Sequence, residues 1–241
     1  MWKQKSWVSV LIVVMSGFLS GCTAHLFSPP ARAFNADGPA ALGEGKTEIQ
    51  GQFASGGIVF GSDFYTGNLH LRHGLSDELD ITVDSGAVVI ETELETGDTE
   101  HWPIYSARVG AQWSPKGGAG HIALTGGLGG GYSAGGGFVS PDAGFSVGYN
   151  NPYLVPYFSA TGFLSLPIAP QAIDVTAGGP ADMQTPEFSF GVEGTVGVRG
   201  KIPINQSQHL VIMAGVSMTI LKDSVETDRF IGGFGSLGYQ F

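Results

Sequence analysis

Nine charged residues lie on the polar face of segments in which polar and apolar residues alternate, and they have the greatest potential for chemistry. An unpaired buried charge is strongly unfavourable, so these charges would pair with one another if they were enclosed. They could equally line a narrow conduit for small polar solutes. Both arrangements use the same residues, so a salt-bridged plug and a polar channel stay open. The nine are Lys46, Arg72, Arg108, Arg199 and Lys201, against Glu48, Asp80, Asp84 and Glu193.

The histidines offer little support for catalysis, which needs a nucleophile within reach of a base. His70 could pair with Asp80 or Asp84 across a hairpin, and His101 lies beside an acidic segment. No histidine stands in a spacing typical of an enzyme motif. We therefore predict no catalytic residue, no cofactor and no enzymatic activity.

An acidic segment is the one candidate for cation binding. Residues 91–100 contain five carboxylates and no basic side chain, and closely spaced oxygen ligands can bind Ca²⁺. The spacing does not match a calcium-binding loop of the D-x-D-x-D-G kind. We expect a solvated loop and no metal site. The carboxylates are Glu91, Glu93, Glu95, Asp98 and Glu100.

The composition excludes several classes of protein. Of 241 residues, 39 are Gly, more than twice the usual share of about 7%. Charged residues make up only 13% and hydrophobic residues 42%, so the chain is not a disordered acidic polymer. A single cysteine excludes a disulfide framework, and a net charge of −10 argues against nucleic acid as a partner. These values suit a β-rich protein with an apolar exterior.

The elements that must position the charges are β-strands, because the segments alternate with a period of two from residue 46 onward. In the hairpin over residues 66–84, for example, Leu79, Ile81 and Val83 alternate with Asp80, Thr82 and Asp84. The pattern predicts ten strands, or eight if residues 143–150 form a loop. A soluble sandwich turns its apolar faces inward and a membrane barrel turns them outward, so alternation alone does not separate the two.

No run of 18 apolar residues is present, so we expect no transmembrane helix. If the chain spans a membrane, it must therefore do so as a closed barrel.

The first 21 residues have the pattern of an export signal. Lys3 and Lys5 precede an apolar stretch over residues 7–18. The following Leu19-Ser20-Gly21-Cys22 resembles the lipobox of bacterial lipoproteins, which implies cleavage before Cys22 and acylation of that cysteine. Cleavage after Ala33 is the alternative, because residues 31–33 form an A-x-A pattern. We predict a signal peptide over residues 1–21, a flexible lipidated tether over residues 22–45 and a barrel over residues 46–241.

The C-terminal strand indicates the class of protein. Leu237, Tyr239 and Phe241 stand at the fifth-from-last, third-from-last and last positions. This pattern resembles the insertion signal of bacterial outer-membrane β-barrels, although Ser236 stands where glycine is common. The resemblance implies a closed antiparallel transmembrane barrel in the outer membrane. Its surroundings would be outer-membrane lipid and lipopolysaccharide, and the barrel-assembly machinery would read the signal.

Three functions stay open for such a barrel. The first is a structural or interaction role in the cell envelope, with an envelope protein as partner and the lumen filled by paired charges. The second is a narrow porin-like channel for small solutes. The third is an outer-membrane enzyme, which the residue spacing supports least.

Overall fold

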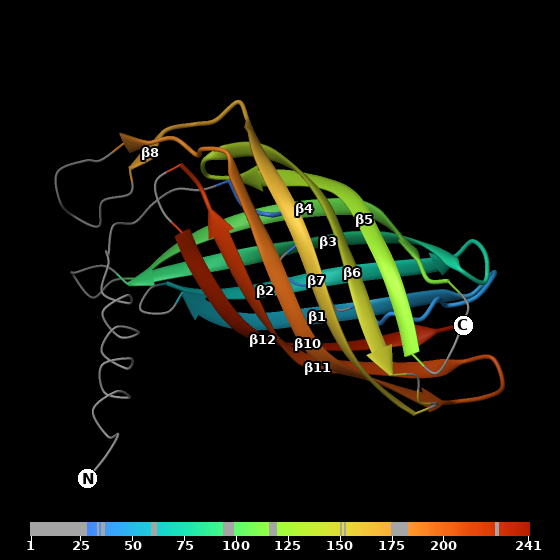
Figure 1. Ribbon diagram of the computed structural model, residues 1–241. Coiled ribbons are helices and arrows are strands. Elements are labelled where there is room, and N and C mark those ends of the chain that lie inside the picture. The colour runs from blue at the N-terminus through green and yellow to red at the C-terminus, as the bar shows by residue number, and fades with distance from the viewer. Residues whose placement is uncertain are drawn as a thin grey trace, which may run out of the picture.

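Ten long antiparallel strands close into a barrel in the computed structural model (Figure 1). Each strand pairs with its sequence neighbours, and β1 pairs with β12 to complete the wall. The predicted ten-stranded closed barrel is thereby confirmed. The strands are β1 (Thr47–Ile58), β2 (Asp63–Gly74), β3 (Leu79–Glu93), β4 (Thr99–Trp113), β5 (Gly120–Ser133), β6 (Gly136–Tyr149), β7 (Leu154–Ile168), β10 (Ser189–Pro203), β11 (His209–Lys222) and β12 (Thr227–Gln240).

A small hairpin stands apart from the wall. β8 (Ile173–Asp174) and β9 (Met183–Gln184) pair with each other within the connection between β7 and β10.

The structure describes residues 28–32, 34, 37–58, 62–93, 99–115, 120–149, 151, 153–174, 183–224 and 227–241. Within these ranges, no helix is long and apolar enough to cross a bilayer.

The strand β6 is longer than the sequence pattern indicates. The pattern starts this strand at residue 143, but β6 begins at Gly136, directly after a two-residue turn from β5. Gly136 has a φ of 107°, which a residue without Cβ adopts readily, so the chain reverses at once. Pro141, which has no N–H to donate, lies where the pairing between β6 and β7 is interrupted.

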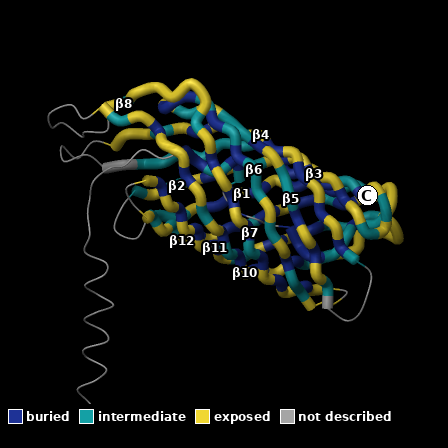
Figure 2. Tube along the Cα trace, turned by 45° about the horizontal axis from the view of Figure 1, so that its top comes forward, coloured by how far each residue is buried: buried dark blue, intermediate teal, exposed yellow. Residues whose placement is uncertain are grey.

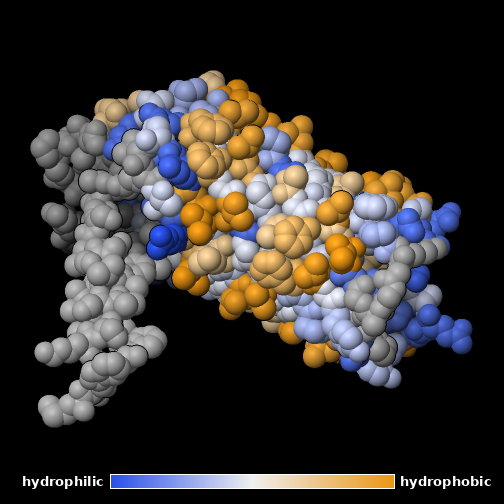
Figure 3. All heavy atoms as spheres, in the orientation of Figure 1, coloured by the Kyte–Doolittle hydropathy of each residue, from blue (hydrophilic) through white to orange (hydrophobic). Residues whose placement is uncertain are grey.

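The pleat turns apolar side chains outward and polar side chains inward. Burial alternates residue by residue along the strands (Figure 2), and hydrophobic side chains gather around the middle of the barrel (Figure 3). This orientation is the reverse of that in a soluble sandwich and excludes it. Outward residues more than half exposed include Leu69, Val109, Leu128, Val196, Val216 and Leu237. Inward residues at most 1% exposed include Glu48, Gln50, His70, Arg72, Asp80 and Gln112.

Outward aromatic side chains lie near both ends of the apolar band. Trp113, Tyr149 and Phe241 are at the end where the chain terminates. Tyr105 and Tyr132, which are paired between β4 and β5, are toward the other end. Two such aromatic levels are typical of a barrel whose apolar band faces lipid, because amphipathic rings prefer the membrane interfaces.

The described residues from Ser28 to Leu42 lie inside the barrel. The Ser28 hydroxyl is 2.8 Å from that of Ser165 in β7. At the opposite end, the Gly45 amide donates to the Gly74 carbonyl at the end of β2, at 2.9 Å. The described residues between them contact inward side chains of the wall. Over the described residues, this path differs from the free tether that we expected over residues 22–45.

Candidate functional site: the filled lumen

The centre of the lumen holds a cluster in which the N-terminal segment and the wall share charges. Arg32 donates to Asp37 at 2.7 Å and lies 3.7 Å from Asp84 of β3. His70 of β2 stands between the two carboxylates, with Nε2 2.9 Å from Asp37 and Nδ1 2.6 Å from Asp84. An imidazolium has an N–H on each ring nitrogen, so the charged form suits a position between two carboxylates.

Arg108 of β4 extends this cluster across the wall. Its Nε and one terminal nitrogen donate to the two oxygens of Asp142 at 2.5 and 2.7 Å, a bidentate arrangement. Its other terminal nitrogen donates to Asp84 at 3.2 Å and to the Thr82 hydroxyl at 3.3 Å. One guanidinium therefore connects carboxylates of β3 and β6.

A second group of ion pairs lies toward the end where the chain terminates. Arg72 of β2 pairs with Asp80 of β3, and Arg199 of β10 pairs with Glu48 of β1. Gln50 donates to Glu48 at 2.5 Å and accepts from the Ser236 hydroxyl at 3.0 Å. Neutral amides and hydroxyls thus supply further hydrogen bonds beside these ion pairs.

Most of the nine predicted residues face the lumen. Seven are buried: Glu48, Arg72, Asp80, Asp84, Arg108, Glu193 and Arg199. Glu193 accepts from Thr195 at 2.8 Å, and Lys201 is half-buried on the same face of β10. Lys46 is exposed instead, because β1 begins only at Thr47. Lys46 belongs to the preceding turn, in which its amide donates to the Gly43 carbonyl.

Four further residues join these contacts and were missing from the predicted set. His70 was expected to pair with Asp80 or Asp84 across the hairpin, and the register pairs it with Asp84. Asp142 was assigned to a loop. Arg32 and Asp37 lie in a segment without periodicity, so no pattern marked them.

The charges of this luminal network balance. The network has five basic side chains and six acidic ones, so with all of them charged a protonated His70 makes it neutral. A neutral, paired interior is what an enclosed lumen requires, because unpaired charges are strongly disfavoured there. The members are Arg32, Arg72, Arg108, Arg199 and Lys201, Asp37, Glu48, Asp80, Asp84, Asp142 and Glu193, and His70.

Apolar contacts also hold the N-terminal segment. Phe34 stacks on Phe234 of β12 with ring centroids 5.1 Å apart, within a buried cluster. Ala31 packs with Ile104 of β4 and Phe138 of β6. The wall leaves room at Gly129 of β5, where an added Cβ would lie 2.4 Å from the Ala31 Cβ. The lumen is thus shaped to this segment.

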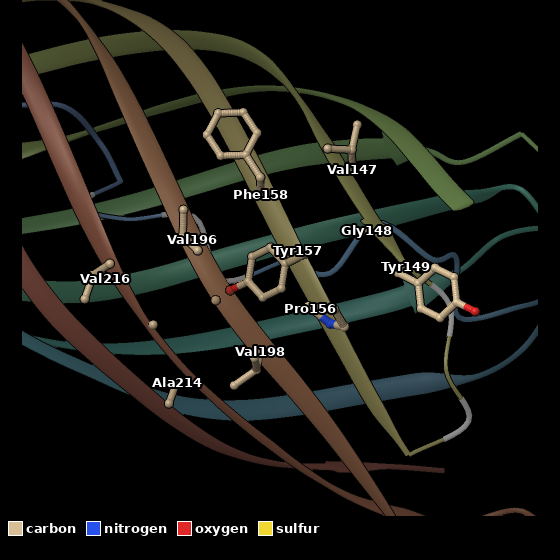
Figure 4. A pocket seen from close by; sticks show the side chains of 12 residues that line it. Val147, Gly148, Tyr149, Pro156, Tyr157, Phe158, Val196, Val198, Ala214 and Val216 are labelled. Carbon is tan, nitrogen blue, oxygen red and sulfur yellow. The ribbon is translucent and has the colours of Figure 1, made fainter. Parts of the chain in front are cut away.

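The outer wall bears a shallow apolar groove across β6, β7, β10 and β11 (Figure 4). Phe158, Val196 and Val216 line it, and all three are outward residues of the lipid-facing band. Tyr157 beside them is buried, and its ring covers Gly197, where an added Cβ would lie 2.8 Å from the ring. The groove therefore belongs to the membrane-facing surface and is separated from the lumen.

The other predicted sites have few described contacts. Cys22 and the signal peptide over residues 1–21 lie outside the described residues, as do Glu95 and Asp98 of the acidic segment. His101 lies 3.3 Å from Glu91 on the surface. Among the described residues, no three His, Cys, Asp or Glu side chains are grouped so that they could hold a metal ion.

The insertion-signal residues lie on the outer face of the last strand. Leu237 is 59% exposed and Phe241 48% exposed, and the Phe241 ring stacks on Tyr239 at 5.7 Å. Phe241 also exchanges backbone hydrogen bonds with Thr47, at 2.8 and 2.9 Å, which joins the chain end to the start of β1.

No family model matches the chain, and no curated protein matches it either. Among solved structures, the translocator domain of autotransporter NalP from Neisseria meningitidis is 12% identical over 98% of this chain and 94% of that chain, with a TM-score of 0.49. The β domain of the Bordetella autotransporter BrkA is 13% identical over 82% and 99%, with a TM-score of 0.49. The outer-membrane protease OmpT from Escherichia coli is 9% identical over 83% and 97%, with a TM-score of 0.41.

This protein is a small β-barrel of the bacterial outer membrane. The conclusion follows from its own architecture: a closed wall without free edges, an apolar exterior with two aromatic levels and a polar interior. The similarities above are too weak to carry an activity or a partner over to this chain.

Proposed function

We propose that this protein is a closed structural barrel whose N-terminal segment fills the lumen and keeps it from conducting. The main support is that residues of this segment form ion pairs and hydrogen bonds with charged side chains of the barrel wall along the lumen. Arg32 and Asp37 do so through side chains, and the backbone near Gly38, Ala40 and Leu42 does so at Arg72 and Asp80.

The burial of the charges supports this proposal over the porin-like alternative. Side chains that line a water-filled channel keep much of their surface accessible to water. Here the side chains of Arg72, Asp80, His70 and Glu48 have no accessible surface, and that of Arg108 has 2%. The same side chains that could have lined a conduit are paired with one another and with the N-terminal segment.

Single-channel conductance of the purified protein in a planar bilayer tests the proposal. The wild-type protein should be silent. A variant that lacks residues 28–42 should give steady, ohmic conductance, because the wall would then enclose water. Glu44→Gln, an exposed change just beyond the segment, is the matched control and should stay silent.

A second variant keeps the test informative if the deletion fails to assemble. The double substitution Arg32→Ala, Asp37→Ala removes the side-chain contacts of the segment but leaves its length unchanged. Intermittent openings are expected from it. Ohmic conductance by the wild-type protein would overturn the proposal and favour the porin-like channel.

The proposal extends to the ends of the barrel. We propose that residues 1–21 are removed as a signal peptide, that Cys22 is acylated, and that the loops engage an envelope protein. The sequence resemblance to a lipobox supports the first two. Mass spectrometry of the mature N-terminus, with Cys22→Ser as control, tests them. Chemical crosslinking in cells through the β7–β10 connection tests the third.

A further inference from the structure

The two ends of the barrel differ in their connections. At the end that contains the start of β1 and Phe241, adjacent strands are joined by four to six residues. At the other end, four connections have two to five residues, and only the fifth is long: 20 residues join β7 to β10 and include the β8–β9 hairpin. Outer-membrane barrels have short turns in the periplasm and longer loops outside the cell. This rule places the β8–β9 end outside and both the start of β1 and the chain terminus in the periplasm.

The N-terminal segment crosses the lumen in a fixed direction. It begins at the β8–β9 end, where Ser28 donates through its amide to the Glu187 carbonyl at 3.3 Å and accepts through its carbonyl from the Ser189 hydroxyl at 2.5 Å. It passes Phe234 at Phe34. It ends at the periplasmic turns, where the Leu42 amide donates to the Asp80 carboxylate at 3.1 Å.

Contacts in both halves of the lumen prevent this segment from sliding. The Ser165 hydroxyl donates to the Pro29 carbonyl at 2.6 Å near the outer end. The Gln112 side chain donates to the Gly38 carbonyl at 3.0 Å in the inner half. The segment is therefore held at a defined register along its length, and Ser28 stays at the outer end.

We infer that the chain before Ser28 leaves the barrel on the extracellular side, so that the N-terminal extension with Cys22 is presented at the cell surface. The inference rests on the proposed function, because it needs the segment to stay in the lumen. Five residues separate Cys22 from Ser28, so the two positions are at most about 20 Å apart along the extended chain. A lipid on Cys22 would thus enter the outer leaflet beside the barrel that displays it.

Surface labelling of intact cells tests the inference. A short epitope is inserted into the full chain after Ala24, after Gly178 in the β8–β9 loop, or after Asn205 in the turn between β10 and β11. An antibody should label the first two in intact cells, and the third only after the outer membrane is permeabilised. Labelling of the Ala24 epitope only after permeabilisation, together with an accessible Gly178 epitope, would overturn the inference.

A reversed pattern is also decisive. If the Asn205 epitope is accessible in intact cells and the Gly178 epitope is not, the barrel has the opposite orientation and the inference is wrong. Heat-modifiable migration on a gel should show that each tagged chain has assembled as a barrel.

A smaller probe avoids dependence on the inserted epitope. Ala24→Cys should react with a membrane-impermeant maleimide in intact cells at least fivefold more than Asn205→Cys, with the parent chain as the background for Cys22. Equal, low reactivity of both variants would overturn the inference. Conductance of the Ala24→Cys protein separates the two ideas: a silent barrel with a periplasmic N-terminus contradicts only the inference, whereas a conducting barrel contradicts the proposed function.

Discussion

Arg72 and Asp80 form an ion pair across the β2–β3 hairpin in which neither side chain has accessible surface, with Arg72 Nε 2.8 Å from the carboxylate. The pair also holds the N-terminal segment. A terminal nitrogen of Arg72 donates to the Ala40 carbonyl at 2.7 Å, and the carboxylate of Asp80 accepts from the Leu42 amide. Each partner thus satisfies the other and the backbone of the segment at once.

Replacing Arg72 with Ala should destabilise the barrel by about 3–5 kcal/mol, because it leaves Asp80 buried without its cation. The measurement is urea-induced unfolding in lipid vesicles. Arg229→Ala removes an exposed arginine of β12 and should change the free energy of unfolding by less than about 1 kcal/mol. Equal effects of the two substitutions would show that the buried Arg72–Asp80 pair contributes no more to the stability of the barrel than an exposed arginine does.

Gly129→Val should displace the N-terminal segment, since an added Cβ would lie 2.4 Å from Ala31 and 2.8 Å from the Ala107 carbonyl. Amide hydrogen exchange over residues 28–44 should accelerate at least tenfold. Gly67→Val is the control, because Gly67 faces outward on β2 with no atom within 4 Å of an added Cβ. Unchanged exchange in Gly129→Val would contradict a lumen fitted to the segment.

Phe34→Ala should lower the free energy of unfolding by about 3–5 kcal/mol, the usual effect of emptying a buried aromatic site. Phe34 is 3% exposed and stacks on Phe234, so its removal leaves a cavity between the segment and β12. Phe188→Ala, at a ring that is 43% exposed, should have a much smaller effect. Denaturant unfolding followed by tryptophan fluorescence measures both. A loss below about 1 kcal/mol for Phe34→Ala would mean that the segment does not stabilise the barrel.

His70→Ala should weaken the central cluster, because Asp37 and Asp84 would face each other without the ring between them. We expect a loss of about 3 kcal/mol or more, as for other broken buried ion pairs. His73→Ala on the outer face of β2 removes only a bond to the Thr47 hydroxyl, at 2.9 Å, and should cost about 1 kcal/mol. A thermal unfolding scan of the two variants in the same detergent compares them. If His73→Ala proves the more harmful, the central cluster is not a source of stability.

Local patterning made the strands and their faces predictable. A strand turns alternate residues to opposite faces, so Arg72 and Asp80 could be placed on one face without knowledge of the fold. The register of the β2–β3 hairpin follows from its short turn, which also pairs His70 with Asp84. The extent of β6 was harder to predict, because Gly136 reverses the chain within two residues and leaves no visible loop.

The contacts of Arg32 and Asp37 were beyond sequence reasoning. These residues lie in a stretch rich in Ala, Pro and Gly, which has no period and resembles a linker. Apart from their contact with each other, their partners in the wall are more than 30 residues away in the chain, so only closure of the barrel brings them together. Lys46 illustrates the opposite case, because a one-residue difference in where β1 begins moves its side chain from the lumen to the surface.

The sequence by itself determined a β-barrel with polar residues on one face of its strands, because alternation, turns and the C-terminal pattern are local properties. The resemblance of the C-terminal strand also implied that the polar face turns inward. Only the tertiary structure decided that the described residues from Ser28 to Leu42 occupy the space enclosed. The physical reason is that closing ten strands creates a lumen in which buried charges require ion-pair or hydrogen-bond partners, and in which the space beside the glycines must be filled by other atoms. The nearest chain able to supply them is the segment that enters β1.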